Sequence, residues 1–176
     1  MDQDREKLID LAVAGDRDAL EALLTQAQDM VFHLSLRMLG TVPDAEDAAQ
    51  ETMLRAWRSY GGGRGGSSEK TWLTAIAMNV CRTMLRSPWR TRRAGPEALE
   101  GLTVTDAPRG DDTLLHAVAA LPRKYREVVV LYYYQELTIR EISQALSVPA
   151  NTVGVRLKRA RERLRPMLKE WYYDEP

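Results

Sequence analysis

The sequence has very little cysteine and histidine: its 176 residues include one cysteine and two histidines. Cys81 therefore cannot form a disulfide within the chain, and a chain without disulfides suits a reducing compartment, so we expect a cytoplasmic protein. Cys81, His33 and His116 also lack the spacing of metal ligands. We therefore expect no metal site.

Long hydrophobic runs are absent as well. No stretch approaches the roughly 20 apolar residues that a membrane-spanning helix needs, and the first ten residues, MDQDREKLID, are too charged for a secretory signal. The glycine-rich tract at residues 61–68 lacks the Lys-Ser/Thr ending of a phosphate-binding loop. The sequence contains no catalytic triad either. We expect no membrane insertion, no cofactor and no catalytic residue, so the chain is not expected to be an enzyme.

The formal net charge of zero hides a strong segregation of charge along the chain. Residues 1–51 carry 4 basic and 12 acidic side chains, whereas residues 52–95 carry 9 basic and 1 acidic. Residues 113–169 carry 11 basic and 4 acidic side chains. Two basic blocks of this kind indicate two surfaces that face polyanions, although clustered solvated helix faces explain the charges equally well.

The apolar residues recur mostly at helical spacing, which predicts an all-α fold. Asp16 is expected to cap a helix that ends before Gly40, and Asp44 to cap a helix running to about Tyr60. A further helix is expected from about Glu69 to Arg86. Residues 128–134 have strong strand propensity, but we interpret them as a buried helix because no second strand is available to pair with them.

The last third of the chain has the layout of a helix-turn-helix. Thr138 and Glu141 form a capping box before a short helix to Leu146, and a longer helix starts near Asn151 after a tight turn. One face of the longer helix is apolar, and the other carries several cations. Such a face can contact guanine edges and phosphates, although it also fits a dimer interface.

These residues resemble region four of the extracytoplasmic-function (ECF) sigma factors of bacterial RNA polymerase. The similar stretches are residues 121–128, 137–142, 148–153 and 156–161. The resemblance implies binding to the upstream (minus-thirty-five) promoter element and to the flap of the polymerase beta subunit. Together, the basic face and the resemblance give these expected DNA contacts: Asn151, Thr152, Arg156, Lys158, Arg159 and Arg163. Gly154 and Val155 depart from the family, which often has a basic residue and a serine there, so base specificity does not carry over.

Residues 44–57 resemble the region-two helix with which sigma factors dock on the clamp helices of the beta-prime subunit. Carboxylates and an amide surround an apolar side chain on one face of this predicted helix, and such a face suits an arginine-bearing partner helix. The resemblance implies these polymerase contacts: Asp47, Gln50, Glu51 and Leu54.

Residues 67–82 resemble the segment with which the family melts and reads the downstream (minus-ten) promoter element. That task needs a pocket for an unstacked base, polar groups for its edge and cations for the backbone. The residues expected to serve it are Ser67, Ser68, Trp72, Asn79, Arg82 and Arg86. Glu69, Thr83 and the glycine tract depart from the family pattern.

The resemblance covers about residues 20–93 and 113–166 and implies a sigma factor of two small helical domains. We expect a polymerase-docking and minus-ten domain at residues 1–93, a flexible linker at 94–112, and a helix-turn-helix domain at 113–176. The expected partners are core polymerase, promoter DNA and an anti-sigma factor. Two alternatives remain from the residues alone: a dimeric helix-turn-helix regulator that does not bind polymerase, and a protein-interaction module that does not bind DNA.

Overall fold

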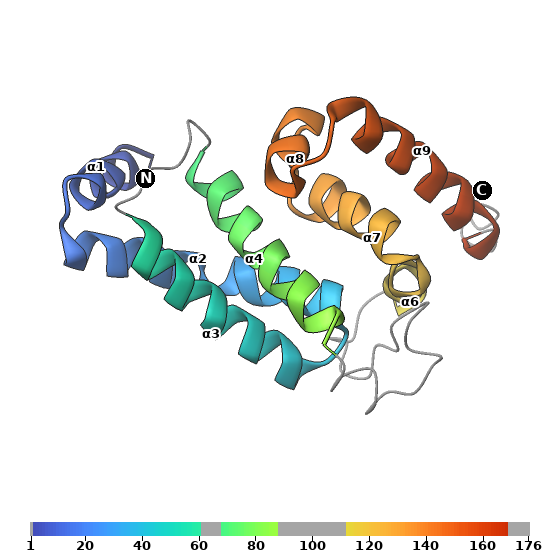
Figure 1. The fold of residues 1–176 in the computed structure, drawn as a ribbon, viewed down its shortest axis with the longest axis horizontal. Helices are drawn as coiled ribbons and strands as arrows, with labels where there is room; N and C mark the ends of the chain where they lie inside the picture. The colour runs from blue at the N-terminus through green and yellow to red at the C-terminus, as the bar shows by residue number, and fades with distance from the viewer. Residues whose placement is uncertain (1, 61–67, 88–111, 169–176) are drawn as a thin grey trace, which may run out of the picture.

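The computed structural model describes residues 2–60, 68–87 and 112–168, and within those ranges its regular elements are helices, with no strand. This agrees with the all-α fold expected from the sequence. The elements in chain order are α1 (Asp2–Val13), α2 (Arg17–Leu39), α3 (Val42–Ser59), α4 (Glu69–Leu85), α6 (Asp112–Ala120), α7 (Arg123–Val129), the π-helical segment η3 (Val130–Tyr134), α8 (Ile139–Leu146) and α9 (Ala150–Met167) (Figure 1). The glycine tract up to Ser67 and most of the expected linker lie outside the described residues.

The ends of α2 follow the sequence signals. The Asp16 carboxylate accepts hydrogen bonds from the backbone N–H groups of Asp18 and Ala19, so it caps the helix as expected. Gly40 ends α2 with a φ of 85°, a left-handed conformation that glycine adopts without steric cost.

The expected cap of α3 is wrong. Thr41 is the N-cap residue, and its hydroxyl accepts a hydrogen bond from the backbone N–H of Asp44. Asp44 instead lies in the first turn of the helix, where its charge still suits the positive end of the helix dipole. Pro43 lies in the same turn, where the missing N–H costs no hydrogen bond.

The helix-turn-helix is formed by α8 and α9. Thr138 and Glu141 make the predicted capping box at the start of α8. Ser147 turns the chain with a φ of 54°, and Pro149 precedes the first residue of α9. The ambiguous segment at residues 128–134 is helical, as interpreted from the sequence, and its last five residues form the π-helical turn η3.

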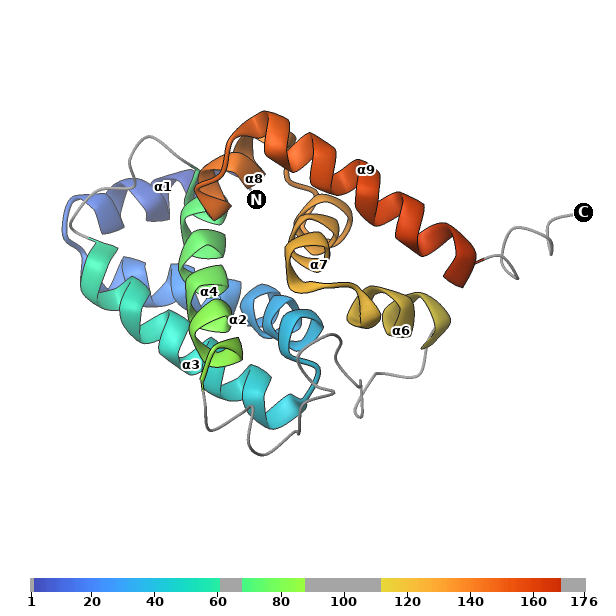
Figure 2. The same cartoon turned by 45° about the vertical axis from the view of Figure 1, so that its right-hand side comes forward.

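Buried side chains from both halves of the chain form one continuous hydrophobic core. In Figures 1 and 2, α4 lies between the α1–α3 group and the α7–α9 group. It packs against α2 and α3 on one side and against α8 on the other. The contact between α4 and α8 therefore joins the two halves. The sequence predicted a linker between two domains but not this direct contact.

Within the part of the chain that the structure describes, no helix is both long and apolar enough to cross a membrane. The same residues include no group of three or more histidine, cysteine or acidic side chains placed to bind a metal ion. Cys81 is buried.

Candidate nucleic-acid and protein interfaces

A groove of about 770 Å³ runs between α2 and α3. Gln50 and Leu54, two of the four residues predicted to contact polymerase, line this groove. Leu54 is 49% exposed, which leaves an apolar contact available at the groove. The other lining residues are Leu24, Gln28, Asp29, Phe32, Glu46, Ala49, Met53 and Trp57.

The remaining two predicted polymerase contacts lie outside the lining of this groove. Asp47 is exposed on α3, and the Glu51 carboxylate accepts a hydrogen bond of 2.8 Å from Arg55 one turn later. The structure thus combines Gln50 and Leu54 with α2 side chains that the sequence analysis missed, above all Asp29 and Phe32. No motif marks the α2 residues, because only the packing of α2 on α3 makes them part of one surface.

The residues predicted to read the downstream element occupy different surroundings. Ser68 caps α4, and its hydroxyl accepts a hydrogen bond from the backbone N–H of Thr71. Trp72 is half-buried and packs edge-on against Tyr60, with ring centroids 5.3 Å apart. Asn79 and Arg86 are exposed, and Ser67 lies outside the described residues.

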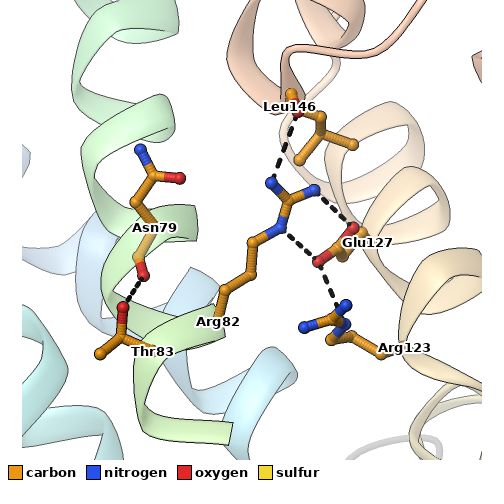
Figure 3. Close-up of polar contacts among 6 residues, drawn as sticks. All are labelled: Asn79, Arg82, Thr83, Arg123, Glu127 and Leu146. Carbon is orange, nitrogen blue, oxygen red and sulfur yellow. Dashed lines mark hydrogen bonds and ion pairs between the residues drawn. The ribbon is translucent and has the colours of Figure 1, made fainter. Parts of the chain in front are cut away.

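Arg82 reaches across to the other half of the molecule (Figure 3). Its Nε and Nη2 donate hydrogen bonds of 2.7 and 2.9 Å to the two carboxylate oxygens of Glu127 on α7. Its Nη1 donates to the backbone carbonyl of Leu146 at the end of α8. The hydrogen bond with Glu127 raises the pKa of Arg82 above its usual range and outweighs the opposite effect of burial. The Arg82 side chain points toward Glu127, whereas the Asn79 side chain lies on another side of α4 (Figure 3).

Two further contacts support the junction between the halves. The Lys70 ammonium donates a hydrogen bond to the backbone carbonyl of Gln135. The Arg37 guanidinium lies 4.1 Å from the centroid of the Tyr134 ring, and burial lowers the pKa of Arg37. Three cations of the first half are thus directed at α7, η3 and the segment after it.

A second hollow, of about 290 Å³, lies beside the start of α9. It is lined by four of the residues predicted to contact the upstream element, together with three that the sequence analysis did not assign. The predicted four are Asn151, Thr152, Arg156 and Arg159, and the additional three are Lys124, Tyr125 and Val155. Lys158 and Arg163 are exposed on α9 outside the lining.

Tyr125 forms part of the wall of this hollow and lies among cations. The Lys124 ammonium and the Arg163 guanidinium each lie 5.0 Å from the centroid of its ring. Burial raises the pKa of Tyr125, but a hydrogen bond from Arg159 and the charges of Lys124, Arg163 and Arg159 together outweigh burial, so the pKa lies below its usual range. Lys124, Arg159 and Arg163 therefore make the surface next to the exposed side of α9 strongly positive.

The two halves match two established sequence families. The family model for Sigma-70 region 2 matches residues 23–91, and the model for Sigma-70 region 4 matches residues 111–164. The chain thus carries, in order, the two regions of a sigma factor.

Similarity to individual proteins extends over nearly the whole chain. The chain is 34% identical to the ECF RNA polymerase sigma factor SigW of Bacillus subtilis, over 94% of this chain and 97% of that protein. It is 33% identical to the ECF sigma factor SigM of Mycobacterium tuberculosis, over 92% of this chain and 83% of that protein. The chain belongs to the ECF sigma factors of RNA polymerase.

Solved structures show the same fold. The sigma factor RpoE of Bartonella quintana, determined in complex with the anti-sigma factor NepR, matches with a TM-score of 0.72 and 22% identity over 88% of this chain and 98% of that one. CnrH, determined in complex with the cytosolic domain of CnrY, matches with a TM-score of 0.69 and 21% identity over 93% of this chain and 96% of that one.

Proposed function

We propose that this chain directs core RNA polymerase to promoters by holding the polymerase with its α2–α3 groove and the upstream promoter element with α9. The observation that carries the proposal is the simultaneous exposure of both surfaces. Leu54 and Gln50 are open to a protein partner, while Asn151 and Arg159 are open to DNA. The two working units in this proposal are residues 1–93 and 113–176, joined by residues 94–112.

The groove has the composition of a protein-docking site. Its lining combines apolar side chains, among them Leu54, Phe32 and Trp57, with the polar side chains of Gln28 and Gln50 and the acidic residues Asp29 and Glu46. Interfaces of this kind combine an apolar core with a polar rim that fixes orientation. Clamp helices of the beta-prime subunit that carry arginines would satisfy both parts.

The downstream element requires a rearrangement. Arg82 is bound to Glu127 and Leu146 in this structure, so it cannot also contact promoter DNA here. We propose that binding to core polymerase separates α4 from α8, which frees Arg82 for the downstream element. Asn79 on α4 and Arg86 directly after that helix are already exposed. Polymerase then supplies the nucleotide chemistry, and this chain contributes binding energy without a catalytic step of its own.

Two further parts of the proposal rest on similarity. RpoE was determined in complex with the anti-sigma factor NepR, and we propose that an anti-sigma factor also binds this chain. Because the chain is proposed to work alongside polymerase, we propose that it acts in the cytoplasm. A dimeric helix-turn-helix regulator is not favoured, because residues 23–91 match Sigma-70 region 2 as well.

Co-elution with purified core polymerase in gel filtration tests the docking surface. The wild-type chain should co-elute, and Leu54→Arg should abolish co-elution because a charged side chain would replace the exposed apolar contact of the groove. Leu11→Arg is the matched control, since Leu11 is also an exposed leucine but lies on α1. Wild-type protein that fails to co-elute, or a Leu54→Arg variant that co-elutes like Leu11→Arg, would contradict the proposed docking.

A further inference from the structure

The polar side of α9 carries one exposed aliphatic side chain. Val155 is 49% exposed, whereas the apolar stripe of the same helix, which includes Val153 and Leu157, is buried. The other exposed large hydrophobic residue of α9, Met167, lies at the end of the helix. Val155 therefore lies outside the buried apolar stripe with which α9 packs on the rest of the chain.

The neighbours of Val155 are the residues proposed to contact DNA. Asn151 precedes Val155 by one helical turn and Arg159 follows it by one turn, so the three side chains share one face. Thr152 and Arg156 complete that face, and all five line the hollow at the start of α9. If this face meets promoter DNA, Val155 lies at the centre of the contact.

Gly154 directly precedes Val155 in the sequence. A Cβ atom added to Gly154 would meet nothing within 4 Å, so packing does not require glycine there. Glycine and valine are both weaker helix formers than alanine, and here they occupy consecutive positions of a long helix. The stability of α9 therefore does not account for Gly154 or Val155. A role of this face in binding does.

The major groove offers a single apolar group to such a face. Its base edges present hydrogen-bond donors and acceptors, and only thymine adds a methyl group, at C5. An aliphatic side chain flanked by an asparagine and an arginine matches a thymine beside bases that are read by hydrogen bonds. A protein partner fits less well, because valine is under-represented among binding hot spots and the hollow around Val155 is lined mainly by polar and cationic side chains.

We propose that Val155 is a specificity-determining residue that contacts the C5 methyl group of a thymine in the upstream promoter element. The inference rests on the proposed function, because it assumes that α9 lies in the major groove of that element. It adds a base preference that the family resemblance does not supply, since Val155 stands where the family often has serine.

Replacing thymine with deoxyuridine tests the contact, because uracil pairs identically but lacks the methyl group. A promoter is first selected from a randomised library by the holoenzyme formed from this chain and core polymerase. Each thymine of its upstream element is then replaced singly, and the Kd of the holoenzyme is measured. At one position the wild type should bind about fourfold more weakly, the effect expected for one buried methyl group.

The variant Val155→Ala assigns the effect to this residue. It should bind the thymine duplex about as weakly as the wild type binds the uridine duplex, with no further loss on uridine. The variant is expected to fold, since Val155 is exposed and alanine favours helices. Val13→Ala is the matched control, because Val13 is 60% exposed on α1 and should leave uridine sensitivity unchanged.

Three results would overturn the inference: a selected upstream element without thymine on either strand, a wild type indifferent to every uridine, or a Val155→Ala variant that keeps the uridine sensitivity of the wild type. Failure of the proposed function is distinguishable from failure of this inference. It would appear in the first step of the experiment, as a chain that forms no holoenzyme or selects no promoter.

Discussion

The Arg82 guanidinium on α4 holds both carboxylate oxygens of Glu127 on α7, which joins the two halves of the chain through a bidentate ion pair. Glu127 is only 2% exposed, and Arg123 approaches the same carboxylate at 3.8 Å. A buried carboxylate needs such partners, because an unpaired charge in the interior is strongly unfavourable. The residue proposed to serve the downstream element thus also stabilises the packing of the free protein.

Replacing Glu127 with glutamine should weaken this junction. The amide keeps the shape of the side chain but loses the charge-assisted hydrogen bonds to Arg82, so the free energy of unfolding should fall by about 1–3 kcal/mol. Urea denaturation measures the change. Glu51→Gln is the control, because Glu51 pairs with Arg55 on the surface, where such pairs contribute at most about 1 kcal/mol. Equal stability of Glu127→Gln and wild type would contradict a role for the pair.

The same change should make Arg82 available to DNA. Without core polymerase, Glu127→Gln should bind a single-stranded downstream-element oligonucleotide more tightly than the wild type, because less free energy is needed to separate α4 from α7 and α8. Fluorescence anisotropy at low salt measures the Kd. Arg82→Ala also breaks the ion pair, but it should show no gain, because it removes the cation as well. A similar gain in both variants would show that Arg82 itself does not contact the oligonucleotide.

Gly154→Ala should stabilise the free protein. The added Cβ meets no atom within 4 Å, and alanine is favoured over glycine in a helix by up to about 1 kcal/mol. Urea denaturation should therefore show a higher free energy of unfolding. A loss of stability would mean that α9 needs the conformational freedom of glycine at this position.

Lys124 should contribute a phosphate contact, because its side chain lines the hollow beside Asn151 and Arg156. Lys124→Met removes the charge, and the slope of log K against log salt for holoenzyme binding to promoter duplex should become shallower by about 0.9. Lys7→Met on α1 is the control and should leave the slope unchanged. An unchanged slope for Lys124→Met would place Lys124 outside the DNA interface.

The sequence predicted the features of this fold that are set by neighbouring residues. Asp16 and the Thr138–Glu141 capping box were identified correctly, because a cap depends on side chains within three positions of a helix start. The cap of α3 was misassigned to Asp44, because Thr41, Pro43 and Asp44 all suit a helix start and only backbone geometry separates them.

Relationships across the chain could not be predicted in the same way. Arg82 and Glu127 are 45 positions apart, and neither periodicity nor spacing links an arginine on one helix to an acid on another. Similarly, Asp29 and Phe32 line the groove only because α2 packs on α3, and no sequence motif marks that packing. Residues 128–134 are helical despite their strand propensity. They were interpreted correctly from the sequence, because no second strand is available to pair with them.

Reconstituted run-off transcription tests the central claim most directly. Core polymerase supplemented with this chain should produce a transcript from one defined start site on a promoter selected from a random library, and core polymerase alone should not. Arg156→Ala with Arg159→Ala should reduce that transcript sharply, because both side chains line the proposed DNA-contacting face. A folded wild-type chain that gives no transcript above that of core polymerase alone would contradict the account.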